Sequence, residues 1–135
     1  MSKRRLVDTN LIVRYLVQDH EKHARAASKL FDACDRGDVE IVVLPVVLAE
    51  CVFVLESFYG HLRGVIASTL ERLISSPGVE ISEMTVHLDA LKRYQGTRAH
   101  FVDCLIAATA VAKNVPVSTF DQDFRKFVDV RVETE

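Results

Sequence analysis

Four acidic residues that lie far apart in the sequence stand where the chemistry of an α/β protein is expected. Asp8 closes the first β run, "RRLVD", and Asp121 follows the run "VPVST". Glu50 lies about one turn into a helix predicted to start at Pro45, and Asp103 lies near the start of an alanine-rich helix. Ligands bind beyond the carboxyl ends of parallel strands, where the following helices begin. The four carboxylates are therefore predicted to converge on one rim of a sheet.

Glu50 is the only charged residue in "VVLPVVLAECVFVL", residues 42–55. A lone carboxylate in an apolar setting needs a proton, a partner or a metal. Four carboxylates brought close together repel one another, so the fold must raise the pKa of at least one of them or recruit a cation. A divalent metal is the natural answer, and an all-oxygen set favours Mg²⁺ or Mn²⁺ over zinc or copper. Such an ion polarises a phosphoryl oxygen and lowers the pKa of an attacking water, so the set predicts phosphodiester hydrolysis.

Taken singly, three of these acids have ordinary structural explanations. Asp8 suits a turn after a strand, while Asp103 and Asp121 suit helix N-caps. Glu50, predicted to be buried, caps nothing. The four together favour a metal site.

The positions of the acids depend on alternating strands and helices. Short β runs are predicted at residues 4–8, 39–44, 76–82, 115–121 and 128–133, and helices at 10–19, 23–37, 45–59, 62–74, 86–94 and 100–114, with a helical turn at 122–127. This alternation predicts an α/β fold, a three-layer α/β/α sandwich with a central, mostly parallel sheet. No linker or repeat interrupts it, so residues 1–135 are expected to form a single domain.

Composition agrees with a compact folded protein, with 49% hydrophobic and 27% charged residues. The longest apolar stretch is interrupted by Pro45 and Glu50 and falls short of the ~18 to 20 residues of a membrane span. No signal-peptide pattern follows the basic amino terminus. We expect a cytoplasmic protein without membrane attachment. Six basic residues are candidates for a nucleic-acid path, without a dense basic stripe: Arg14, Arg63, Arg72, Lys92, Arg93 and Arg98.

Three motifs, in their order and spacing, carry a resemblance to a known family. "VDTNLIVRYL", "LAECVFVLESFYG" and "HFVDCLIAATAVAKNVPVSTFDQDF" resemble PIN-domain ribonucleases, and more narrowly the VapC-type toxins of toxin-antitoxin modules. The family's acidic quartet falls on Asp8, Glu50, Asp103 and Asp121. The resemblance implies Mg²⁺- or Mn²⁺-dependent cleavage of RNA, a homodimer and a cognate antitoxin that blocks the site.

Three further residues match polar positions of the family. Asn10 is expected to cap the first helix while hydrogen-bonding a carboxylate or a metal-bound water, and Thr119 to orient Asp121. Asp123 is either a ligand through water or a cap for the turn that follows.

Other functions compete with the nuclease. A phosphatase of the haloacid dehalogenase type needs a second acid where Asn10 stands, and a signalling receiver needs adjacent acids after the first strand and a lysine after the last. A PIN-like module that binds RNA without cutting it is the remaining alternative, and the intact quartet argues against it.

Overall fold

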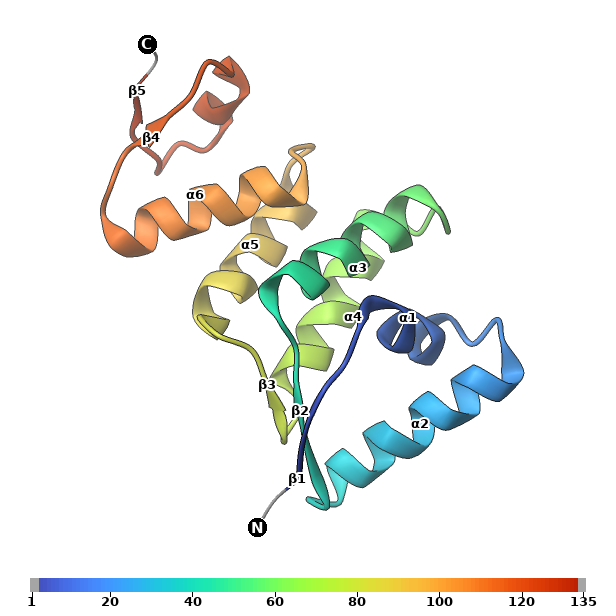
Figure 1. The fold of residues 1–135 in the computed structure, drawn as a ribbon. Coiled ribbons are helices and arrows are strands. Elements are labelled where there is room, and N and C mark those ends of the chain that lie inside the picture. Colours follow the sequence, from blue (N-terminus) through green and yellow to red (C-terminus); the bar gives the residue numbers. More distant parts are fainter. Residues whose placement is uncertain (1–2, 134–135) are drawn as a thin grey trace. The chain divides into compact units, whose positions relative to one another are not determined.

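The computed structural model describes residues 3–133, which divide into two compact units, residues 3–84 (unit 1) and 85–133 (unit 2) (Figure 1). Each unit is described by itself.

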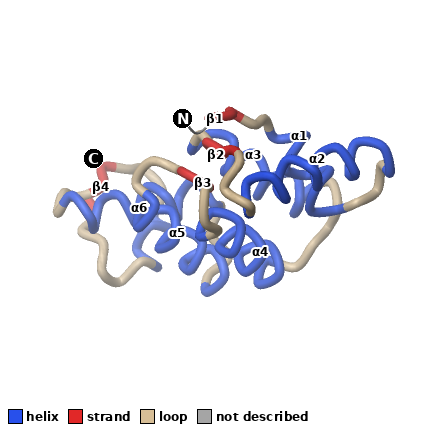
Figure 2. The backbone as a smooth tube through the Cα atoms, turned by 90° about the horizontal axis from the view of Figure 1, so that it is seen from below, coloured by secondary structure: helices blue, strands red, loops and turns tan. Residues whose placement is uncertain are grey.

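Unit 1 is built on a parallel sheet. The order is β1-β2-β3, with Arg5 opposite Ile41 and Ile41 opposite Val79. The three strands lie side by side in that order in Figure 2. Two helices connect each strand to the next, which allows the parallel pairing. The elements are β1 (Lys3–Leu6), α1 (Thr9–Val17), α2 (Glu21–Asp35), β2 (Val39–Val42), α3 (Pro45–Ser57), α4 (Arg63–Ser75) and β3 (Val79–Glu80).

Local sequence sets the ends of these elements. Pro45 occupies the first turn of α3, where its missing N–H costs nothing. Gly37, directly after the C-cap of α2, has φ +83° and turns the chain toward β2. Gly78, before β3, also has φ +83°, and a Cβ there would lie 2.8 Å from Sγ of Cys34. Only glycine fits at position 78 without a shift of its neighbours.

The core of unit 1 joins its helices. Helix α1 packs against α2 and α3, and α3 packs against α4. Burying such aliphatic side chains contributes roughly 1.5 to 3 kcal/mol each. The largest fully buried residues of this core are Ile12, Ile41, Leu48, Leu55, Ile66, Leu70 and Ile74.

A polar cluster stabilises one end of unit 1. Arg14 near the end of α1 pairs with Asp19 at 3.0 Å, and the hydroxyl of Tyr59 donates to Oδ2 of Asp19 at 2.8 Å. The bond from Tyr59 is the main reason why the pKa of Asp19 is lowered, with Arg14 assisting. Tyr59 is thus tied to the loop after α1.

Unit 2 holds two α-helices, the first of which begins at the last residue of unit 1, together with a 3₁₀ helix and a small parallel sheet. Its elements are α5 (Met84–Gly96), α6 (Phe101–Lys113), β4 (Val117–Ser118), the 3₁₀ helix η1 (Gln122–Lys126) and β5 (Val132–Glu133). Val117 lies opposite Val132. The ring of Tyr94 from α5 meets the ring of Phe101 from α6 edge to face, with centroids 6.1 Å apart. This contact fastens the two helices together.

Arg93 of α5 fastens the segment after η1. Its guanidinium donates to both carboxylate oxygens of Asp129, at 2.8 and 2.5 Å, and to Asp89 at 3.2 Å. It also lies over the ring of Phe127, 5.8 Å from the centroid. The bond to Asp129 is the main cause that raises the pKa of Arg93, and it lowers the pKa of Asp129. Arg93, a candidate for a nucleic-acid path, is instead bound to acids of its own unit.

The structure confirms the predicted α/β class with parallel strands. Every predicted helix and β run has a counterpart within a few residues of its expected position. Over residues 3–133, no helix is both long and apolar enough to cross a membrane.

Candidate active site

Asp8 lies at the junction of β1 and α1. It is the N-cap of α1, and its Oδ1 accepts the backbone N–H of Leu11 at 2.9 Å. Such a cap satisfies one of the free N–H groups at the helix start. Asn10 lies inside the first turn of the helix, so the prediction that Asn10 caps it is wrong. The extended backbone of residue 8, φ −97° and ψ 174°, makes Asp8 the cap.

Glu50 has a partner within unit 1. The hydroxyl of Thr9, the first residue of α1, donates to Oε1 of Glu50 on α3. Thr9 is itself buried, with 8% of its surface exposed. This bond holds the carboxylate of Glu50 beside Thr9 at the start of α1. Asp8 is the residue directly before Thr9 in the sequence.

The prediction that Glu50 is buried is wrong, because Glu50 is exposed to solvent. The buried side of α3 is formed by Leu48, Cys51, Val52 and Leu55. At about 100° per residue, Glu50 projects from the opposite side of the helix. Apolar residues flank Glu50 in the sequence, but helical geometry turns its carboxylate away from the core.

The charges of Asp8 and Glu50 act on the same buried thiol. The pKa of Cys51 is raised to about 12, mainly by burial and to a smaller extent by the negative charges of Glu50 and Asp8. Cys51 therefore stays a neutral thiol and is no nucleophile. The hydroxyl of Thr9 binds Glu50, and Asp8 directly precedes Thr9, so both acids lie at the start of α1 in unit 1.

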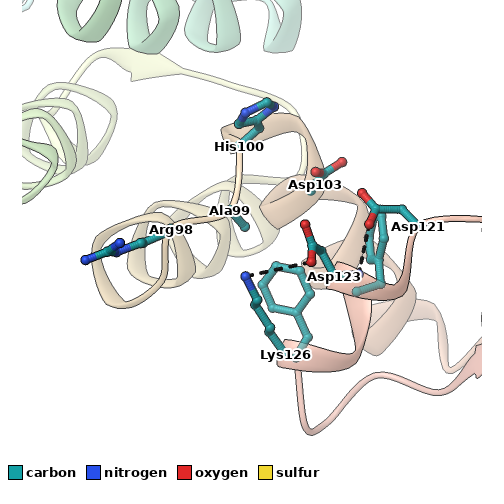
Figure 3. A pocket seen from close by; sticks show the side chains of 9 residues that line it. Arg98, Ala99, His100, Asp103, Asp121, Asp123 and Lys126 are labelled. Atoms are coloured by element: carbon teal, nitrogen blue, oxygen red, sulfur yellow. Dashed lines mark hydrogen bonds and ion pairs between the residues drawn. The ribbon is translucent and has the colours of Figure 1, made fainter.

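Asp103 lies in a pocket of unit 2 (Figure 3). It is the third residue of α6, and the N-cap of that helix is His100, whose side chain makes no capping bond. Asp103 is therefore no cap, although the helix dipole favours an acid in the first turn. The pocket is lined by Arg98, Ala99, His100, Asp103, Asp121, Asp123, Phe124, Lys126 and Phe127.

Asp121 reaches the same pocket from the end of β4. It caps η1 by accepting the N–H of Asp123 at 2.8 Å, and its own N–H donates to the hydroxyl oxygen of Thr119 at 2.9 Å. Thr119 thus holds Asp121 through the backbone. The alternative in which Asp123 caps the turn is wrong, because Asp121 does so. The carboxylate of Asp123 instead lies 3.8 Å from the ammonium of Lys126.

The available donors suit a hard divalent cation. Over residues 3–133, no three His, Cys, Asp or Glu side chains form a metal-binding group. Mg²⁺, however, is usually held by one or two carboxylates and keeps several waters. Unit 1 offers Asp8 and Glu50, and the pocket of unit 2 offers Asp103 and Asp121. Carboxylate oxygens of this kind fit Mg²⁺ or Mn²⁺ better than zinc or copper.

Two residues that lie near these acids, Thr9 and Lys126, were not among the site residues predicted from the sequence. Thr9 stands between Asp8 and Asn10, and nothing in "DTN" indicates which carboxylate its hydroxyl reaches. Lys126 follows Asp123 by three residues, a spacing that brings side chains together on a helical turn. That spacing was the available signal for the ion pair.

Comparison with known proteins places the chain in a family. A family model described as PIN domain matches residues 5–130. No curated protein matches the chain. A similar solved structure is the crystal structure of VapBC2 from Rickettsia felis bound to a DNA fragment from their promoter, 16% identical, covering 98% of each chain, with a TM-score of 0.40. The family match runs through both units and nearly the whole sequence, so the chain belongs to the PIN domain family.

Proposed function

We propose that this chain is a metal-dependent endoribonuclease that acts as the toxin of a toxin-antitoxin module. Its catalytic and metal-binding carboxylates are Asp8, Glu50, Asp103 and Asp121. The observation that carries the proposal is the pocket of unit 2. There, in a PIN-family chain, Asp103 and Asp121 face one hollow, and Asp103 has no role as a helix cap.

The chain's own residues hold three of these carboxylates in place. The hydroxyl of Thr9 holds Glu50, and the N–H of Leu11 holds Asp8. Thr119 and the capped turn hold Asp121. Carboxylates oriented by hydrogen bonds in this way would need little rearrangement to hold a divalent cation. A bound Mg²⁺ or Mn²⁺ supplies a Lewis acid for the phosphoryl group and a water of lowered pKa.

The proposal extends to partners and context, which rest on the resemblance of the three motifs to VapC-type toxins. The substrate is RNA, a cognate antitoxin blocks the site, and the active form is a homodimer of single-domain chains in the cytoplasm. Asn10 assists Asp8 through a hydrogen bond to a carboxylate or a bound water. Asn10 is exposed in the first turn of α1, two residues after Asp8.

A cleavage assay tests the function. Purified protein is incubated with total RNA in millimolar Mn²⁺, and the new RNA ends are sequenced. Wild type is expected to cut, and both EDTA and Asp103→Asn are expected to reduce cutting to background. RNA binding by wild type without any cleavage, in either Mn²⁺ or Mg²⁺, would favour the inactive RNA-binding alternative.

A further inference from the structure

We infer that Lys126 contacts a backbone phosphate of the RNA and that Asp123 holds Lys126 ready for that contact instead of ligating the metal. The inference rests on the proposed function and assigns roles to both residues. Oδ1 of Asp123 and Nζ of Lys126 form an ion pair at 3.8 Å, and both residues line the pocket.

The net charge of the pocket shows why a cation such as Lys126 would help to bind RNA. With His100 neutral, three carboxylates and the cations Arg98 and Lys126 give the lining a net charge of −1. One divalent ion brings that charge to +1, which attracts a phosphodiester. Without Lys126 the loaded pocket would be neutral and would lose this attraction.

Side-chain direction distinguishes Lys126 from Arg98. In Figure 3 the ammonium of Lys126 ends beside Asp123, close to the acids, whereas the guanidinium of Arg98 extends away from them. An ammonium on a flexible stem binds phosphate as a point charge and does not need a fixed approach angle. Lys126 is therefore the cation best placed to touch RNA at the carboxylates.

The ion pair can open when RNA arrives. The side chains of Lys126 and Asp123 are 58% and 75% exposed, and exposed pairs contribute little to stability. A phosphate can replace Asp123 as the partner of Lys126 at small cost. Asp123 then keeps the ammonium near the pocket in the free protein.

The test measures RNA binding without catalysis. Binding of a fluorescent single-stranded RNA to wild type, Lys126→Gln and Lys113→Gln is followed by anisotropy in EDTA at several salt concentrations. Lys113 is an exposed lysine in the last turn of α6 that does not line the pocket, so it is the matched control. Melting curves establish that all three proteins are folded.

Lys126→Gln is expected to raise the Kd for RNA roughly threefold or more. A plot of the logarithm of the binding constant against the logarithm of the salt concentration should become less steep by about 0.7, the value for one lost phosphate contact to a single strand. In Mn²⁺, KM should rise while kcat changes little. A Kd and salt slope equal to those of Lys113→Gln would overturn the inference.

Asp123→Asn distinguishes a role of Asp123 in positioning Lys126 from a role as a metal ligand. If Asp123 only holds Lys126, this variant raises KM no more than Lys126→Gln does, and its kcat falls far less than that of Asp103→Asn. A loss of kcat as large as that of Asp103→Asn would make Asp123 a metal ligand and overturn its assignment here. Failure of wild type to cut any RNA would instead count against the proposed nuclease, and the binding measurements in EDTA would still decide the role of Lys126.

Discussion

Replacing Arg93 by methionine tests how the segment after η1 is held. The Arg93 side chain is only 13% exposed, whereas its partners Asp89 and Asp129 are 38% and 49% exposed and can regain water when Arg93 is removed. Two partly exposed ion pairs contribute about 0.2 to 1 kcal/mol each, and the contact over Phe127 adds about 0.5 to 1. Arg93→Met should therefore lower the free energy of unfolding by about 2 kcal/mol.

For a chain of this length, that loss corresponds to about 7 °C in Tm. Thermal melts followed by circular dichroism measure it, with Arg125→Met as the matched control because Arg125 is exposed in the same unit. An Arg93→Met protein that melts within 1 °C of Arg125→Met would refute the reasoning.

The pH dependence of the same variant gives a second readout. Arg93 lowers the pKa of Asp129 in the folded protein. The resulting stability is fully present above the unfolded pKa, about 3.9, and is lost as pH falls through the lower folded value. The gap in Tm between wild type and Arg93→Met should therefore be constant near neutral pH and narrow below about pH 4. A gap that stays constant down to pH 2 would show that packing of the Arg93 stem, and not its charge, is responsible.

Three further outcomes are expected. Millimolar Mn²⁺ should raise the Tm of wild type, and Asp8→Asn should lose most of that gain; no shift in wild type would contradict a metal site. Glu50→Gln should remain folded but lose RNA cleavage, and cleavage at the wild-type rate would remove Glu50 from the site. Tyr59→Phe should raise the pKa of Asp19 toward its ordinary value, as measured by carbon NMR of the carboxylate; an unchanged pKa would show that the bond from Tyr59 is not the main cause of the shift.

Much of the fold could be predicted because local signals agree with one another. Pro45, Gly37 and the alternation of β runs with amphipathic segments set the elements within a few residues. Periodicity shows where a helix lies, but it did not show which side of α3 faces the core, because that helix is apolar almost all round. The burial of Glu50 was predicted wrongly for this reason.

The sequence names candidate site residues, but it does not show their contacts. Asp121 and Asp123 are both plausible caps for one turn, and sequence alone does not decide between them. The backbone decides, since Asp121 is extended and the turn begins at Gln122. The bond from Thr9 to Glu50 joins residues 41 positions apart, so no local pattern reveals it.

Two of the proposed metal-binding acids also accept hydrogen bonds from backbone N–H groups. A substitution at either position can therefore change the stability of the protein as well as its activity. Asp8 and Asp121 each use one carboxylate oxygen to start a helical segment. Alanine at either position would remove both the ligand and the cap, at about 0.5 to 2 kcal/mol, and would mix misfolding with lost chemistry. Asparagine keeps the capping oxygen and removes only the charge. If the proposed function is right, a relative with asparagine at both positions would fold normally and lack nuclease activity.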